Sequence, residues 1–165
     1  MIMYPESMKG DRSRITTGIS AEYFVAAELS RRGLYASITL KNTPGIDILA
    51  ADESGSRVFF IQVKSKKQMG KGGTKAWLLS KGDESIIGKD FFYVFVNLNN
   101  KKFSPPDIYI VPSKVVSSRI RENHRKFLEG GGKDTPMRVF KMEKKGEEVY
   151  LNNWGVFCTG PEKDL

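Results

Sequence analysis

The sequence has very little cysteine and histidine, with one residue of each, Cys158 and His124. A single cysteine cannot form an intramolecular disulfide or a thiolate metal site. We therefore expect a protein of a reducing compartment, the cytoplasm. A single histidine without a recognisable partner motif also argues against catalysis by a Ser–His or Cys–His pair.

Long apolar runs are missing as well. The run FFYVFV at positions 91–96 is too short to span a bilayer, and the N-terminus has no apolar region followed by a small-residue cleavage site. We expect neither a membrane span nor export. With 165 residues and no internal repeat, the chain predicts a single domain over residues 15–165, preceded by a polar, loosely held arm over residues 1–14.

Acidic residues are absent from one segment of a chain whose net charge is +8. This segment, Lys64 to Gly82, is punctuated by glycine and carries Lys64, Lys66, Lys67, Lys71, Lys75 and Lys81. A positive net charge favours a polyanionic partner, because each lysine or arginine that contacts a phosphate releases condensed counterions. The segment could follow a phosphate backbone, and it could equally be a solvated loop.

The first half of the chain predicts a helix followed by three strands. The helix begins near Thr16 or Thr17 and ends at Gly33, with Phe24, Ala27 and Leu29 on its apolar stripe. Strands are expected over residues 34–39, 46–51 and 57–65. The sequence DESGS, which separates the last two strands, is typical of a hairpin turn, so these strands should pair antiparallel.

The second half predicts further strands and one more helix. Residues 76–80, 91–98 and 108–112 read as strands, and the aromatic and β-branched run at 91–98 suits a strand buried on both faces. Residues 81–90 suggest a short helix or turn. A helix follows over residues 112–129, with Val115, Ile120 and Phe127 as expected core contacts. Weaker strand patterns at 137–140, 148–152 and 154–157 close an α/β or α+β domain around a mixed sheet.

Three polar residues interrupt the apolar strands. Alternation on the strand puts Gln62 and Lys64 on one face, and the hairpin brings Asp47 beside them. Buried polar groups are costly unless they are paired or coordinate a metal. The convergence of a carboxylate, an amide and an ammonium therefore favours a functional site, although an ion pair between Asp47 and Lys64 at the sheet margin would also explain it.

The order of these residues resembles the PD-(D/E)XK nuclease superfamily, the restriction-endonuclease-like fold that includes archaeal Holliday junction resolvases. Glu22 lies on the first helix, Asp47 follows TPG, and Gln62-Val63-Lys64 lies on the next strand. The segments FFYVFVNLNN, IYIVPSKV and NHRKFL resemble small bacterial members of the superfamily. The resemblance covers residues 15–111 and implies a three-layer α/β/α core with element order αβββαβ.

The resemblance also implies roles for the residues. Asp47 and Gln62 would bind Mg²⁺ (or Mn²⁺), Lys64 would orient or help to deprotonate the attacking water, and Glu22 would be a further acidic ligand. Hard oxygen ligands suit Mg²⁺, which activates water for attack on a phosphodiester. Gln62 stands where the family pattern has an acidic residue, and some active members of the superfamily carry glutamine there.

The implied function is a Mg²⁺-dependent nuclease that acts on nucleic acid, DNA in preference to RNA. Because Gln62 is neutral, a catalytically inactive nucleic-acid-binding or protein-interaction module on the same fold is the alternative. Phosphate contacts are expected from Lys66, Lys67, Lys71 and Lys75, and from Arg121 and Arg125 on either side of His124. The oligomeric state is open, although nucleases that cut both strands often act as homodimers.

Overall fold

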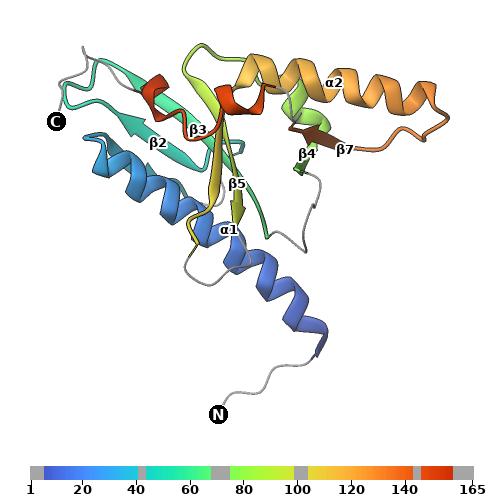
Figure 1. Ribbon diagram of the computed structural model, residues 1–165, viewed down its shortest axis with the longest axis horizontal. Helices are drawn as coiled ribbons and strands as arrows, with labels where there is room; N and C mark the ends of the chain where they lie inside the picture. Colours follow the sequence, from blue (N-terminus) through green and yellow to red (C-terminus); the bar gives the residue numbers. More distant parts are fainter. Residues whose placement is uncertain (1–5, 41–43, 68–74, 99–103, 143–145, 158–165) are drawn as a thin grey trace.

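The computed structural model describes residues 6–40, 44–67, 75–98, 104–142 and 146–157, with side chains from residue 14 onward (Figure 1). Lys71 and Cys158 lie outside the described residues. The elements in chain order are α1 (Glu6–Arg31), β1 (Tyr35–Ile38), β2 (Ile48–Ala51), β3 (Val58–Lys67), β4 (Ala76–Ser80), the 3₁₀ helix η1 (Lys81–Glu84), β5 (Phe91–Leu98), β6 (Asp107–Pro112), α2 (Ser113–Glu129), β7 (Met137–Lys141), η2 (Glu147–Val149) and η3 (Trp154–Phe157).

The main sheet has five strands in the order β1-β2-β3-β5-β6. β3 and β5 pair parallel, and the other neighbours pair antiparallel. The predicted hairpin between β2 and β3 is confirmed, and its turn contains Gly55 with a φ of 69°. The sheet is therefore mixed, as the sequence indicated.

Helices cover both faces of this sheet (Figure 1). Side chains of α1 pack with one face of β3 and β5, where Ile61 and Val94 are fully buried. On the other face, α2 and the small β4–β7 sheet enclose a second core around Tyr93 and Phe95. β5 is buried on both faces, as its aromatic and β-branched composition predicted.

Helix α1 differs from the prediction in its start and in its buried stripe. It begins at Glu6, so residues 6–14 are helical instead of forming an irregular arm. The buried residues are Ala21, Val25 and Leu29, which recur every four residues, whereas Phe24 and Ala27 are exposed. The segment before Ala21 is polar, so a search for apolar residues at helical spacing could not detect the first turns of the helix.

Helix α2 matches its predicted range. Ile120 is fully buried and Val115 packs against the second core. Phe127, expected in the core, is 53% exposed. Its ring lies over Gly132, where a Cβ atom would clash with the ring carbons. Phe127 therefore packs on the turn that ends the helix.

The connection from β3 to β5 also differs from the family order. The expected helix after the third strand is replaced by β4 and η1, and β4 pairs with β7 outside the main sheet. The segments 148–152 and 154–157 contain 3₁₀ helices and one isolated bridge, between Leu151 and Tyr109, in place of strands. Within the described ranges, no helix is long and apolar enough to cross a membrane.

Candidate active site

The start of β2 and the middle of β3 place Asp47 against the backbone on either side of Gln62. The Asp47 amide donates to the Ile61 carbonyl over 2.9 Å, which continues the antiparallel pairing one residue beyond β2. The Asp47 carboxylate accepts a hydrogen bond from the Val63 amide over 2.7 Å. The predicted placement of Asp47 beside the polar face of β3 is confirmed by these two bonds.

Gln62 lies at the centre of a hydrogen-bond network. With its amide oriented to satisfy its neighbours, the amide nitrogen donates to Asp83 Oδ1 over 3.0 Å and to Tyr93 Oη over 3.3 Å. The amide oxygen accepts from Lys64 Nζ over 2.9 Å. The alternation of β3 is confirmed, since Gln62 and Lys64 share one face while Ile61 packs in the core on the other.

Tyr93 on β5 was not predicted as a member of this network, and neither was Asp83 on η1. Only 3% of the surface of Asp83 is exposed. Its Oδ2 accepts from the Ser80 amide over 2.6 Å and from the Ser80 hydroxyl over 2.7 Å, and its Oδ1 accepts from Tyr93 Oη over 2.8 Å. The pattern Ser-x-x-Asp at 80–83 is a capping-box variant, the one sequence signal that could have identified it.

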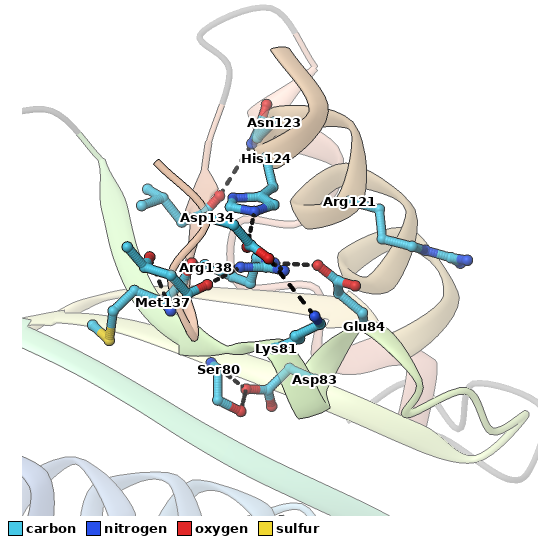
Figure 2. Close-up of polar contacts among 12 residues, drawn as sticks. Ser80, Lys81, Asp83, Glu84, Arg121, Asn123, His124, Asp134, Met137 and Arg138 are labelled. Atoms are coloured by element: carbon cyan, nitrogen blue, oxygen red, sulfur yellow. Dashed lines mark hydrogen bonds and ion pairs between the residues drawn. The ribbon is translucent and has the colours of Figure 1, made fainter. Parts of the chain in front are cut away.

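The η1 helix is held in place from α2 and β7 (Figure 2). Arg138 on β7, whose side chain is 3% exposed, forms an ion pair with Glu84. The Ser117 hydroxyl on α2 donates to the Glu84 carbonyl over 2.5 Å. These contacts fix the residue next to Asp83, so the position of Asp83 depends on the second layer of the fold.

Charges around the site act on Asp47 in both directions. Burial raises the pKa of the Asp47 carboxyl above its ordinary value, and the nearby Asp83 raises it further. The Val63 amide and the Lys64 ammonium oppose this shift because they favour the ionised form. Burial, together with Asp83, also raises the pKa of the Tyr93 hydroxyl, which therefore stays protonated and donates to Asp83.

A pocket of about 470 Å³ lies over this network. Gln62, Lys64, Ser80 and Asp83 supply its polar lining, and the apolar lining includes Leu78, Ile86 and Met137. The loop before Asp47 forms part of the wall. Gly45, at a φ of 74°, approaches Ile86 so closely that a Cβ atom would lie 3.3 Å from its Cδ1.

Glu22 lies on α1 at a partly buried position. Among the residues that the structure describes, no three histidine, cysteine, aspartate or glutamate side chains form a group able to hold a metal ion. Glu22 therefore does not join Asp47 and Asp83 in such a group. Gln62 and Asp83 supply oxygen atoms to the pocket lining, and the Asp47 carboxylate lies close by at the Val63 amide.

The lysines near the site have different surroundings. Lys66 lies 4.9 Å from the centre of the Trp77 ring, and burial and Lys75 lower its pKa. Lys75 forms an ion pair with Glu147 at 2.7 Å. Lys67 is exposed at the end of β3. Trp77 itself is buried in the second core.

The basic residues on α2 are engaged within the protein. Arg125 forms ion pairs with Glu122 and Glu129, and His124 pairs with Asp134 at 2.9 Å. Arg121 donates to the carbonyl and hydroxyl oxygens of Ser117, and Figure 2 shows it directed away from the cluster around Arg138. These contacts give no support to the predicted phosphate-binding role of Arg121 and Arg125.

Comparisons with known proteins identify the fold. No protein-family model matches the chain, and no curated protein matches it in sequence. Among solved structures, the chain is similar to the bacterial homing endonuclease I-Ssp6803I, with a TM-score of 0.55, 16% identity, and coverage of 86% of this chain and 90% of that one.

A second similar structure is Hjc of Archaeoglobus fulgidus, a Holliday junction resolvase from an archaeal hyperthermophile. Its TM-score is 0.50 at 15% identity, with coverage of 84% of this chain and 93% of that one. Both similarities extend over most of each chain and agree with the mixed five-stranded sheet between two helical layers. The protein has a restriction-endonuclease-like fold.

Proposed function

We propose that the protein is a Mg²⁺-dependent nuclease that hydrolyses phosphodiester bonds in DNA. The observation that supports this most directly is that Gln62 and Lys64 line the open pocket of a nuclease-like fold, while the Asp47 carboxylate accepts a hydrogen bond from the backbone amide between them. These three residues come from two paired strands, so their spacing is fixed by the sheet.

The residues present fit a divalent cation. Asp47 offers a carboxylate and Gln62 offers an amide oxygen, and both are the hard oxygen donors that Mg²⁺ prefers while it keeps several waters. When bound there, the ion supplies positive charge that acidifies the attacking water and offsets charge building on the phosphate. Burial and Asp83 raise the pKa of Asp47 in the metal-free protein, and a cation would favour the ionised carboxylate.

Lys64 is the proposed partner of the nucleophile. Its ammonium donates to the Gln62 oxygen and reaches the pocket, where it can hold the attacking water and stabilise negative charge on it. The buried side of β3 fixes the strand, so Lys64 is presented on a rigid element. Its role is to orient and to stabilise charge without competing for the cation.

DNA is the proposed substrate, because both similar structures are of proteins named for action on DNA and the chain carries a net charge of +8. Lys66 and the exposed Lys67 follow Lys64 on β3, and Lys75 comes just before β4. A cytoplasmic location and action as a homodimer complete the proposal.

Cleavage assays with duplex, single-stranded and branched DNA in Mg²⁺ or Mn²⁺ test this function. We expect the wild-type protein to cut at least one substrate, and Asp47→Asn and Lys64→Met to reduce the rate by about 10²-fold or more. A chelator should abolish the cut. Equal residual activity in the wild type and both variants would show that the activity comes from a contaminant.

A non-catalytic binding module is the second candidate. The hydrogen bond from Lys64 to the Gln62 oxygen favours this candidate, because it satisfies that oxygen, a potential metal ligand, without a cation. This module would bind DNA with an affinity that falls steeply with salt, survives Lys64→Met and needs no metal. Tight binding without cleavage would select it, and absence of binding at low salt would exclude it.

A further inference from the structure

The orientation of the Gln62 amide decides what the site offers to a ligand. A side-chain amide has an NH₂ group that only donates hydrogen bonds and an oxygen that only accepts them. If the nitrogen turned toward Lys64, two donors would face each other and the pocket would lose its carbonyl oxygen. The donor on Lys64 and the acceptor on Asp83 therefore assign the oxygen to the Lys64 side and the nitrogen to the Asp83 side.

Asp83 supplies the reason for this orientation. An ionised carboxylate can only accept hydrogen bonds, and Asp83 is held rigidly by two donors from Ser80 and one from Tyr93. The group that faces its Oδ1 must therefore be a donor. With 8% of Gln62 and 3% of Asp83 exposed, solvent is not a ready substitute for either partner.

The same contact explains why position 62 carries an amide where the family pattern has an acid. A glutamate at position 62 would place a carboxylate against the buried Asp83, at the position where the Gln62 nitrogen now lies 3.0 Å from Oδ1. Two like charges at this separation repel strongly away from water. A neutral residue at 62 and an acidic residue at 83 are therefore matched to each other.

We propose that Asp83 is a positioning residue that holds the Gln62 amide with its oxygen toward Lys64 and the pocket, and that it makes an amide the fitting residue at position 62. This inference rests on the proposed function for its effect on cleavage. The contact itself exists in the metal-free protein and can be tested there.

The first test uses NMR on the metal-free protein. In the wild type, the side-chain NH₂ resonances of Gln62 should show a hydrogen bond to a carboxylate, through a downfield shift and slow exchange. Asp83→Asn should move these resonances upfield or broaden them, because an amide at position 83 cannot accept from both Ser80 and Gln62 without conflict. Resonances that stay unchanged in Asp83→Asn would overturn the proposal.

The second test is a reciprocal exchange. Gln62→Glu and Asp83→Asn should each lower the midpoint of thermal unfolding, and the double variant should recover most of the combined loss, because the amide and the carboxylate have changed places. Ser117→Ala is the control, since it removes a hydrogen bond to η1 without altering charge. When Ser117→Ala is combined with Gln62→Glu, the two losses in unfolding midpoint should add. If the losses from Gln62→Glu and Asp83→Asn also added in their double variant, the proposal would be overturned.

Cleavage provides the third measurement. Each single variant should lose about tenfold or more in kcat, and the double variant should recover most of that loss. If the wild type does not cut DNA, the proposed nuclease function fails, while NMR and unfolding still decide the role of Asp83. If the wild type cuts and the losses multiply in the double variant, only the positioning role fails. Should Gln62→Glu not fold alone, a folded double variant would itself be the expected rescue.

Discussion

The two faces of β3 perform different tasks with side chains that alternate along a single strand. On the α1 side, Phe59 and Ile61 are fully buried among apolar neighbours. On the opposite side, Gln62 and Lys64 join a polar network with Asp83. The first face supplies hydrophobic burial, and the second is satisfied only through specific partners. The comparison teaches that stability and chemistry can be separated by one residue along a strand.

The largest loss of stability is expected from a substitution on the apolar face of β3. Phe59 makes edge-on ring contacts with Phe92 and Phe157, at centroid distances of 6.2 and 5.2 Å. Phe59→Ala should lower the free energy of unfolding by about 3–5 kcal/mol, through lost burial and the cavity that remains. Chemical denaturation measures this loss, and Phe60→Ala, on the same strand but 38% exposed, is the matched control. Equal losses in both variants would contradict the assignment of the two faces.

A smaller loss of stability is expected when a contact that supports the polar face of β3 is removed. Arg138→Met removes the buried partner of Glu84 and should lower the free energy of unfolding by about 2–4 kcal/mol. This loss is smaller than that expected for a fully buried ion pair, because Glu84 is partly exposed. Chemical denaturation again measures it. Lys141→Met, at an exposed position on the same strand, removes an equal charge as a control. If the two variants were equally stable, the pair would not hold η1.

Lys64→Met should separate function from stability most clearly. It removes one donor to Gln62, and we expect a loss of about 1 kcal/mol of unfolding free energy. Cleavage should nevertheless fall far more than this loss of stability would explain. Parallel denaturation and cleavage measurements on one preparation make the comparison. A variant that unfolds at room temperature would show that Lys64 is primarily structural.

The smallest effect is expected on the surface of α2. Arg125→Ala breaks exposed ion pairs with Glu122 and Glu129, and such pairs contribute little because water and salt screen them. The unfolding midpoint should stay nearly unchanged, and so should DNA affinity. Reduced affinity with normal stability would restore the phosphate-binding role predicted for this helix.

Much of the site could be predicted because it depends on local rules. Strand alternation placed Gln62 and Lys64 on one face, and the turn around Gly55 fixed the register that brings Asp47 alongside. These relations involve residues close in sequence. The resemblance to PD-(D/E)XK nucleases then supplied an expectation for the fold, which the similar structures confirm.

The parts that could not be predicted depend on distant packing. Asp83 faces Gln62 only because β7 and α2 hold η1 from behind, and no local pattern records that contact. The first turns of α1 contain Gly10 and mostly polar residues with no apolar stripe, so a search for periodicity begins too late. Phe127 is apolar and correctly spaced, but its position in the last turn of α2 leaves it over Gly132.

The parallel pairing of β3 with β5 has a consequence for folding. Antiparallel neighbours can join through a short turn, whereas this pair requires the chain to travel through β4 and η1 before it returns. Such non-local pairing carries a loop-closure cost before its contacts form, and it slows folding. Gln62, Asp83 and Tyr93 come from β3, the crossover and β5. The polar network therefore requires this non-local pairing, whereas the β2–β3 hairpin requires only a short turn.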